Sequence, residues 1–356
     1  IVRIVDHEGV FIALGHYQIG SIAVRILSFD EIAIDTNFWV SRLRQAFRMR
    51  ANLGYTNRKD EHSIYRLVHG EGDQLPGLIV DIFGETAVMQ AHSVGMHVCR
   101  EYIADALLVA TDGQIKNVYY KSETTLPYKA GLGQENGFLR GNTIENIALE
   151  NGLKFHIDWL HGQKTGFFID QRDNRALLEH YSRGKNVLNM FCYTGGFSVY
   201  AMRGAANLVH SVDVSAKSIE LTRQNVGLNF PNDTRHDAFA EDAFKYLQRA
   251  GSDYDLIVLD PPAFAKHKDA LRNALKGYTR LNAAAFSKIR PGGIVFTFSC
   301  SQAVNKDQFR LAVFTAAAQS KRHVRILHQL HQPADHPINI YHPEGEYLKG
   351  LVLYVE

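Results

Sequence analysis

Residues 186–198 read NVLNMFCYTGGFS, a short apolar run that leads directly into a glycine-rich turn. The apolar run has the length and composition of a strand buried on both faces of a sheet. Gly195 and Gly196 lack a Cβ atom, so the backbone of the turn can approach a ligand closely. The turn has neither GxGxxG spacing nor a Walker lysine, which disfavours dinucleotides and ATP. The stretch therefore predicts the first strand–turn–helix unit of an α/β domain.

The same alternation of strands and helices continues towards the C-terminus. Apolar strands are predicted at residues 210–214, 255–260 and 294–299, and the segment 215–229 has the pattern of a helix. Strands that alternate with helices form a parallel sheet with right-handed crossovers. An open sheet of this kind binds ligands at the carboxyl ends of its strands. We therefore expect the functional site where these strands end.

The part of the chain before this sheet has a different pattern. Residues 1–36 contain three short β-branched stretches, which are too few to bury a core alone and resemble the second half of a small barrel. The first residue is Ile rather than Met, so we expect the chain to begin inside a longer gene product. The remaining expectations before residue 165 are a helix at 37–55, a hairpin at 77–91, a helix at 98–110, a strand at 115–120, a loop at 126–141 and a hairpin around Asn151-Gly152 at 143–159.

Acidic residues stand at or near the ends of three expected strands. Asp213 ends the second strand, 24 residues after Asn189, where a carboxylate can accept both ribose hydroxyls of an adenosine. Asp242 lies in the third element, residues 236–247, and is placed to bind an adenine amino group. Asp260 ends the fourth strand and is followed by two prolines. A strand that ends in Asp is often only a helix cap, but the order and spacing of the set predict an adenosine-containing cofactor.

This set of motifs resembles the class I methyltransferase fold, in which strands one and four lie side by side at the switch point of the sheet. The family adds a segment before the first strand that closes over the cofactor, and residues 163–172, QKTGFFIDQR, match that segment closely. The resemblance implies an α/β, Rossmann-like domain with a seven-stranded sheet and S-adenosyl-L-methionine as cofactor. The cofactor-binding residues that it implies are Gln163, Thr165, Phe168, Asp170, Asn189, Phe191, Tyr193, Thr194, Gly195, Gly196, Asp213, Ser215, Asp242 and Asp260.

Cys300 stands directly after the strand at 294–299. In the class I order the fifth strand is the neighbour of the fourth, so Cys300 and Asp260 should lie at one edge of the sheet, next to the methyl donor. This pair suits methylation of carbon 5 of cytosine. A thiolate that attacks carbon 6 makes carbon 5 nucleophilic, and a carboxyl group at ring nitrogen 3 stabilises the adduct. The other interpretation of Cys300 is a buried strand-end cysteine, and Cys192 and Cys99 are both expected to be core residues.

The stretches that carry a more specific resemblance are 15–28 (GHYQIGSIAVRILS), 162–172, 187–198, 260–264 with 299–301, and 344–350 (EGEYLKG). They are similar to the bacterial large-subunit (23S) rRNA cytosine-carbon-5 methyltransferases that carry an N-terminal PUA domain. The resemblance implies Cys300 as nucleophile, Asp260 as the acid that contacts the base, and 23S rRNA as partner. It also implies a partial PUA β-barrel at 1–36, a small central α/β domain at 37–150 and the methyltransferase domain at 151–356. Relatives can self-associate, so a homodimer stays open.

Two other functions stay open. An amino-group methyltransferase that acts on an rRNA purine or a protein glutamine commonly carries an aromatic residue directly after the two prolines, where this chain has Ala263, with Phe264 one position further on. A non-catalytic RNA-binding assembly factor is expected to have a degraded cofactor pocket, and the intact glycines and carboxylates argue against it. Many RNA cytosine-carbon-5 enzymes have a second cysteine beside these prolines, and this sequence departs from them because it has none there.

Charge is concentrated in two parts of a nearly neutral chain, whose formal net charge is +2. Residues 41–66 contain seven basic and two acidic residues, and residues 265–290 contain seven basic and one acidic residue. Two such stretches indicate a polyanionic partner, although either alone is also typical of a solvated helix face. By the family resemblance, residues 42–50 line an RNA groove, where phosphate contacts give affinity rather than sequence choice.

Several classes of protein are disfavoured by composition. The sequence has no run of apolar residues long enough for a membrane-spanning helix, and its three cysteines are far apart, which favours a reducing cytoplasm. Four histidines gather between residues 328 and 342 without an HExxH pattern or a cysteine pair. We therefore expect no membrane partner, no metal and a cytoplasmic location.

Overall fold

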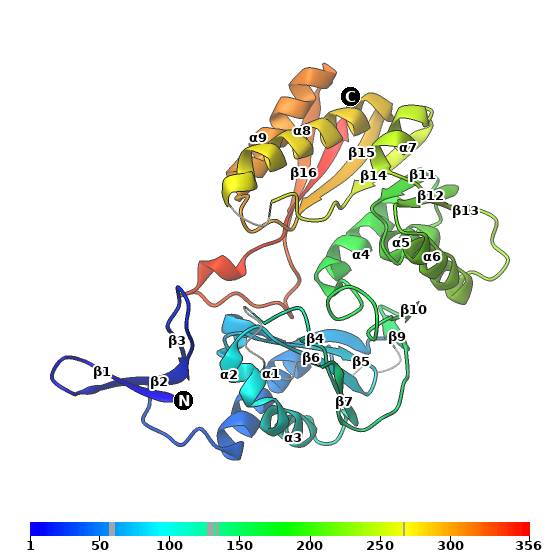
Figure 1. The fold of residues 1–356 in the computed structure, drawn as a ribbon. Helices are drawn as coiled ribbons and strands as arrows, with labels where there is room; N and C mark the ends of the chain where they lie inside the picture. The colour runs from blue at the N-terminus through cyan, green and yellow to red at the C-terminus, as the bar shows by residue number, and fades with distance from the viewer. Residues whose placement is uncertain (57–60, 127–131, 133–134, 266–267) are drawn as a thin grey trace. The chain divides into compact units, whose positions relative to one another are not determined.

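The computed structural model describes residues 1–356 except 57–60, 127–131, 133–134 and 266–267 (Figure 1). The described chain forms two compact units. The first contains Ile1–Ile169 and Ala334–Gly345, and the second contains Asp170–Pro333 and Glu346–Glu356. The chain therefore returns to the first unit for a short segment near its C-terminus.

A seven-stranded sheet forms the centre of the second unit. Its strand order is β13-β12-β11-β14-β15-β17-β16, and the strands are parallel except that β17 pairs antiparallel with both of its neighbours. The first and fourth strands of this unit, β11 and β14, lie side by side, which confirms the expected class I order. The strands are β11 (Asn186–Met190), β12 (Leu208–Asp213), β13 (His236–Ala240), β14 (Tyr254–Leu259), β15 (Ile289–Ser299), β16 (Val324–Leu330) and β17 (Lys349–Val355).

The helices of the second unit pack in two groups. Helix α4 packs on α5 and α5 on α6, whereas α7 packs on α8 and α8 on α9. An apolar cluster of this unit joins β14 and β15 to the second group through side chains such as Ile257, Phe286 and Phe309. This core fixes the strand ends that carry the candidate site. The helices are α4 (Arg172–Tyr181), α5 (Gly196–Arg203), α6 (Ala216–Asn229), α7 (Ala243–Arg249), α8 (Leu271–Lys288) and α9 (Lys306–Ser320), with short 3₁₀ turns at Ile169–Gln171 and Lys268–Ala270.

The first unit contains a five-stranded sheet of order β4-β5-β6-β7-β8 and a separate three-stranded antiparallel sheet, β1-β2-β3. Helix α1 packs against α3 beside the larger sheet, around Trp39, Leu43 and Leu107. The elements are β1 (Val2–Val5), β2 (Phe11–Tyr17), β3 (Val24–Ser28), α1 (Thr36–Asn52), β4 (Ile64–His69), β5 (Leu78–Phe83), β6 (Thr86–Ala91), α2 (Val94–Val98), α3 (Arg100–Ala110), β7 (Asn117–Tyr120), β8 (Gly137–Arg140), β9 (Ile147–Glu150) and β10 (Leu153–His156), with 3₁₀ turns at Gly70–Asp73 and Pro343–Gly345.

The hairpin expected around Asn151-Gly152 is confirmed. Strands β9 and β10 pair antiparallel, with Leu153 opposite Glu150. Asn151 and Gly152 have φ angles of 51° and 76°, the left-handed pair that a two-residue hairpin turn of this type requires. Local turn chemistry alone was enough to predict this element.

Two strands, β4 and β8, and the short helix α2 were not predicted. The segment 126–141 was expected to be a loop, but its described part contains β8, where Arg140 donates to Asp105 Oδ1 at 2.6 Å and Phe138 packs edge-on against Tyr119. Strand β4 was not predicted at all. The helix expected at 98–110 is confirmed as α3, Arg100–Ala110, and the short helix α2, Val94–Val98, which was not predicted, precedes it with Cys99 between them. Contacts between distant residues, rather than local pattern, decide β8.

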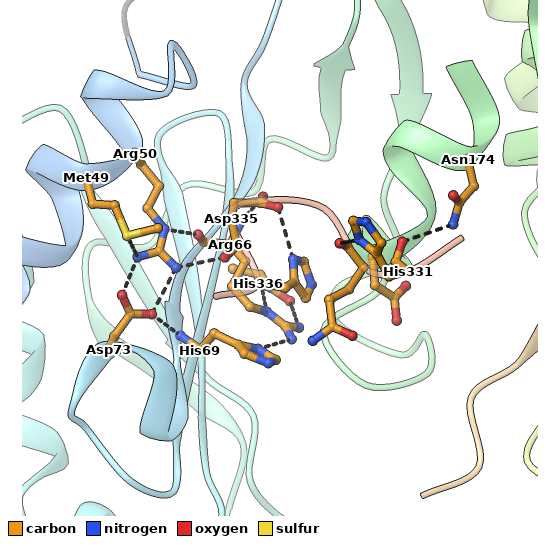
Figure 2. A network of polar contacts seen from close by, with 12 residues as sticks. Met49, Arg50, Arg66, His69, Asp73, Asn174, His331, Asp335 and His336 are labelled. Atoms are coloured by element: carbon orange, nitrogen blue, oxygen red, sulfur yellow. Dashed lines mark hydrogen bonds and ion pairs between the residues drawn. The ribbon is translucent and has the colours of Figure 1, made fainter. Parts of the chain in front are cut away.

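The returning segment, residues 334–345, is held in the first unit by a buried arginine (Figure 2). Arg50 is fully buried, and its guanidinium donates to Arg66 O at 2.8 Å, to Asp73 Oδ2 at 2.9 Å and to Asp335 O at 2.7 Å. The Asp335 carboxylate in turn accepts from the backbone N–H of Arg66 at 2.9 Å. Arg50 belongs to the basic run that was expected to line an RNA groove, and the fold uses it internally instead.

The first unit also extends beyond residue 150, where the sequence suggested a domain boundary. Thr165 is buried in it and donates its hydroxyl to Asp81 Oδ2 at 2.6 Å. Asp81 also binds the Arg66 guanidinium, at 2.7 Å from Oδ1 to Nε. The chain from 151 to 169 therefore packs with the first unit, and the second unit begins at Asp170.

Candidate active site

The turn between β11 and α5 has an unusual backbone. Phe191, Tyr193 and Gly195 have φ angles of 58°, 47° and 80°, all in the left-handed region. Non-glycine residues seldom adopt this conformation, and those that do concentrate at ligand-binding sites. The Gly195 N–H donates to Cys192 O at 2.8 Å, and the Thr222 hydroxyl donates to Tyr193 O at 2.9 Å. The expected ligand-binding turn is therefore a strained loop that the surrounding fold holds in place.

The two glycines of this turn pack closely against other parts of the protein. A Cβ atom on Gly195 would lie 2.6 Å from Thr222 Cγ2 of α6, and one on Gly196 would lie 3.0 Å from Arg175 Cδ of α4. The sequence interpretation gave these glycines a role in close approach to a ligand. Their neighbours show that they also let α4 and α6 close onto the turn.

Asp213, at the end of β12, holds the turn and its own strand end together. Its Oδ2 accepts from the Tyr193 N–H at 3.0 Å, and its Oδ1 accepts from the Ser215 N–H at 2.9 Å. Each carboxylate oxygen has two lone pairs, so the group keeps capacity for two hydroxyl donors of a ligand. Asp213 can therefore bind a ribose while it shapes the pocket.

Asp213→Asn is expected to weaken the affinity for S-adenosylmethionine by about tenfold, since an amide can accept at one oxygen only and carries no charge. Isothermal titration of the purified protein measures the dissociation constant. Asp237→Asn is the matched control, because Asp237 is an exposed carboxylate on the neighbouring strand β13. An Asp213→Asn protein with wild-type affinity would show that this carboxylate does not contact the cofactor.

Ser215 and Asp242 both act as helix caps. Ser215 Oγ accepts from the Ser218 N–H at 3.3 Å at the start of α6, and Asp242 Oδ1 accepts from the Lys245 N–H at 3.0 Å at the start of α7. Capping was the alternative that the sequence left open for such residues, and it leaves Asp242 Oδ2 for a ligand. Both groups stand after the carboxyl ends of parallel strands, β12 and β13.

Other residues expected in the cofactor site are less accessible. Asn189 is buried and donates its Nδ2 to Ser198 Oγ at 2.9 Å, and Thr194 is also buried. Asp170 accepts a hydrogen bond from the Tyr347 hydroxyl at 2.6 Å. Gln163, Thr165 and Phe168 belong to the first unit, whereas the rest of the expected set belongs to the second.

The second unit supplies the chemistry that S-adenosylmethionine needs. Asp213 and Asp242 offer carboxylate acceptors to ribose hydroxyls and an adenine amino group. Asn189 Oδ1 is buried at the end of β11 and has no hydrogen-bond partner among the described residues. The carboxylate and amide acceptors at these strand ends suit a cofactor that carries hydroxyls, amino groups and a sulfonium. The residues present therefore fit the cofactor.

Cys300 and Asp260 follow neighbouring parallel strands at the same edge of the sheet. Leu259, the last residue of β14, pairs with Thr297, which lies two residues before the end of β15. The two strands therefore end close together at the same edge of the sheet. Cys300 Sγ lies 4.0 Å from the carbonyl oxygen of Pro261. Cys300 is half-buried, and it stands beside the two prolines that follow Asp260. The strand order thus brings a thiol and a carboxyl group to one place, as the sequence predicted.

Tyr278 of α8 lies behind this pair. Its hydroxyl accepts from Ser299 Oγ at 2.9 Å, and burial raises its pKa to about 12, with the negative charges of Cys300 and Asp260 acting in the same direction. The Tyr278 phenol therefore stays protonated at neutral pH. The Phe264 ring packs on Tyr278, with 4.7 Å between ring centroids. Phe264, the second residue after the two prolines, therefore packs against α8.

Lys349 is the first residue of β17. Like Tyr278, it is a residue of the site that sequence reasoning missed. It is 6% exposed, and its ammonium donates to Ser301 O and to Tyr347 O, both at 2.6 Å. Burial lowers its pKa to about 8, while Cys300 and Glu346 act to raise it. A lysine at the first position of a buried apolar strand was the available signal in the sequence.

The other two cysteines have different surroundings. Cys192 is buried among Ile219 and Ala238, and burial raises the pKa of its thiol, which fits the expected core role. Cys99 is half-buried, and its sulfur lies 3.7 Å from His16 Nε2. Burial also raises the pKa of the Cys99 thiol. Neither thiol stands at the end of β14 or β15.

Helix α8 carries an exposed basic face. Arg272, Lys276 and Arg280 are exposed and spaced four residues apart, so they lie along one side of the helix. Residues 266–267 of the same basic stretch, and residues 57–60 of the earlier one, lie outside the described residues. Within the described chain, no helix is both long and apolar enough to cross a bilayer, and no cluster of His, Cys, Asp or Glu has the composition of a metal site.

Known proteins resemble this chain over almost its whole length. A family model for S-adenosylmethionine-dependent methyltransferases matches residues 128–345, and one for a PUA-like domain matches residues 1–29. Ribosomal RNA large subunit methyltransferase I of Shewanella denitrificans is 39% identical over 361 residues, which cover 99% of this chain and 90% of that protein. The protein of the same name from Tolumonas auensis is 40% identical, with 99% and 89% covered.

Solved structures share the fold at lower sequence identity. A Streptococcus mutans protein described as a SAM-dependent methyltransferase has a TM-score of 0.84 at 22% identity, covering 98% of this chain and 89% of its own. A methyltransferase complexed with SAH has a TM-score of 0.85 at 22% identity, with 99% and 90% covered. The chain therefore belongs to the S-adenosylmethionine-dependent methyltransferase family, carries a PUA-like domain at its N-terminus, and is a relative of the proteins named ribosomal RNA large subunit methyltransferase I.

Proposed function

We propose that this enzyme methylates carbon 5 of a cytosine in large-subunit ribosomal RNA, through a covalent adduct with Cys300. Its dependence on S-adenosylmethionine follows from its family. The choice of ribosomal RNA rests on the names of its relatives, which are about 39% identical over nearly the whole chain. The choice of atom rests on the residues at the ends of β14 and β15.

The first step is the attack of Cys300 on the ring. Carbon 5 of cytosine is a weak nucleophile. The Cys300 thiolate forms a bond to carbon 6, and the electron pair of the double bond between carbons 5 and 6 moves onto the ring, so that carbon 5 becomes enamine-like. The charge that develops on ring nitrogen 3 is negative, so Asp260 acts there as a protonated carboxyl group, which donates its proton to the nitrogen and recovers it when the adduct breaks down.

The second step is methyl transfer and release. S-adenosylmethionine supplies an electrophilic methyl group, and carbon 5 takes this methyl as the methyl–sulfur bond breaks, which leaves S-adenosylhomocysteine. A base then removes the proton from carbon 5, the double bond between carbons 5 and 6 forms again, and Cys300 leaves as thiolate. The atoms balance with one proton released for each methyl transferred. The target base must be single-stranded or flipped out of a helix to reach the thiol.

The placement of Cys300 beside Asp260-Pro261-Pro262 is the observation that carries the proposal. Methylation of an amino group needs no thiol. Here Ala263 occupies the position directly after the prolines, and the Phe264 ring packs on Tyr278. The thiol, by contrast, stands where the two parallel strands end. These contacts favour attack on a ring carbon over stacking on an exocyclic amine.

The basic face of α8 suits the RNA backbone. Arg272, Lys276 and Arg280 are exposed on the helix that also carries Tyr278, whose hydroxyl binds Ser299 next to the nucleophile. Phosphate contacts from such a face give affinity and position without selecting sequence. The exposed basic face is therefore a candidate contact for the RNA backbone on the outer side of α8.

Nucleoside mass spectrometry tests the reaction directly. We expect 23S rRNA incubated with the protein and methyl-labelled S-adenosylmethionine to yield labelled 5-methylcytidine after digestion. Labelled N-methyladenosine or N-methylguanosine in its place would contradict the proposal and indicate an amino-group methyltransferase. Label in protein rather than in RNA would contradict the proposal and indicate that the substrate is a protein.

A further inference from the structure

Lys349 stands next to the proposed nucleophile without a role in the reaction as described. It lies opposite Ser299 in the β15–β17 ladder, and Ser299 directly precedes Cys300. Its Nζ donates to Ser301 O at 2.6 Å, on the other side of Cys300. Lys349 therefore contacts the residues directly before and directly after Cys300, namely Ser299 and Ser301.

The ammonium group of Lys349 is fixed in place. Its side chain is only 6% exposed, and two of its three N–H donors are directed at the carbonyls of Ser301 and Tyr347. Lysines are almost never this buried unless they are paired or have a function. Two neutral carbonyls do not compensate a buried positive charge fully, so an anion nearby would stabilise it.

The charged groups around Lys349 come from several elements. Cys300 follows β15, Glu346 precedes β17, Lys306 begins α9, and the Tyr278 phenol stands on α8 with Asp260 near it. Lys306 and Glu346 form an ion pair with each other, so they offset one another. Burial lowers the pKa of Lys349 to about 8, and the negative form of Cys300 is the strongest influence that raises it again. The lysine therefore keeps its charge most readily when Cys300 is a thiolate.

We propose that Lys349 is a positioning residue that stabilises the Cys300 thiolate with a fixed, buried positive charge. The thiol proton leaves to solvent, and the electron pair stays on Cys300 Sγ beside the Lys349 ammonium. A thiolate, not a thiol, is the nucleophile, and a neighbouring cation raises its population at neutral pH. The inference deepens the proposed function and rests on it for the meaning of the thiolate, but the ionisation itself can be measured without RNA.

The rate of Cys300 alkylation by iodoacetamide, followed against pH, measures the thiolate fraction. Peptide mass spectrometry separates the Cys300 peptide from those of Cys99 and Cys192. We expect Lys349→Gln, which keeps amide donors for the two carbonyls but has no charge, to move the midpoint up by about one pH unit. The rate at neutral pH should then fall about tenfold. Lys349→Arg, which keeps the charge, should stay close to wild type.

Two further variants separate charge from structure. Lys349→Met is a second neutral variant that keeps an unbranched apolar chain in the buried position, and it should shift the profile as Lys349→Gln does. The double variant Lys306→Gln, Glu346→Gln removes both charges of the nearby ion pair together, so their offsetting effects are lost at once and the profile should stay in place. Affinity for S-adenosylmethionine, measured on each protein, confirms that the second unit is folded.

An unchanged alkylation profile in folded Lys349→Gln would overturn the inference, as would an equal shift in Lys349→Arg. Each of these outcomes is distinct from a failure of the proposed function. If labelled 5-methylcytidine is formed but the titration of the Cys300 thiol does not change in the Lys349 variants, only the inference about Lys349 fails. If the titration depends on Lys349 but the label appears in another nucleoside, the thiolate is stabilised and the proposed reaction fails.

Discussion

A Cys300→Ala enzyme is expected to lose 5-methylcytidine formation by about 10⁴-fold or more, because no other group replaces the bond that makes carbon 5 nucleophilic. The other two thiols are poor substitutes. Cys192 is buried among apolar side chains, and Cys99 belongs to the first unit, beside His16. The measurement is the initial rate of label transfer from S-adenosylmethionine to 23S rRNA, with the nucleoside identified.

Cys99→Ala is the control for Cys300→Ala, since it removes a half-buried thiol of the first unit and should keep the wild-type rate. Affinity for S-adenosylmethionine should be the same in both variants, because neither sulfur is placed in the cofactor pocket. A Cys300→Ala enzyme that still methylates cytosine at carbon 5 would exclude Cys300 as the nucleophile. Cys300 would then be a cysteine that only packs at the end of its strand.

An Asp260→Asn enzyme is expected to lose about 10²–10³-fold in kcat. The carboxyl group is proposed to donate a proton to ring nitrogen 3 during attack, and an amide of the same shape cannot act as an acid. Asp260 follows β14 directly, and its charge acts on Tyr278 together with that of Cys300, which indicates that the three groups are close. Initial rates over a range of S-adenosylmethionine concentrations, up to saturation, separate kcat from KM.

Asp253→Asn is the matched control for Asp260→Asn, because Asp253 is exposed just before the start of the same strand. It should have wild-type kinetics. If Asp260→Asn raised KM for S-adenosylmethionine and left kcat unchanged, Asp260 would be a cofactor ligand and not a group that contacts the base. The sequence resemblance gave it both roles, and the split between kcat and KM distinguishes them.

The sheet of the second unit could be predicted from sequence because its information is local. Strands such as β11 and β14 are continuous apolar runs that end in a glycine turn or an acidic residue, and parallel strands buried on both faces have that pattern. Once the strand order is known, the ends of β14 and β15 must meet at one edge. The meeting of Cys300 and Asp260 follows from topology without any side-chain detail.

The residues around that pair could not be predicted in the same way. Lys349 lies 49 positions after Cys300 in the chain, and only the antiparallel pairing of β15 with β17 brings them together. In the sequence, Tyr278 looks like any aromatic residue on the apolar side of a helix. Only the structure shows that its hydroxyl accepts a hydrogen bond from Ser299. Arg50 looked like part of a basic surface, yet it is fully buried on Asp73. In each case a distant partner decides the role.

Covalent trapping tests the central claim, that Cys300 bonds to the target cytosine, most directly. In 23S rRNA transcribed with 5-fluorocytidine, carbon 5 carries fluorine in place of the proton that must leave, so the enzyme cannot be released after methyl transfer. We predict an RNA–protein adduct that depends on S-adenosylmethionine, and a modified nucleotide on the Cys300 peptide by mass spectrometry. An adduct that forms equally in Cys300→Ala, or the absence of any adduct from an enzyme that methylates normal rRNA, would contradict the account.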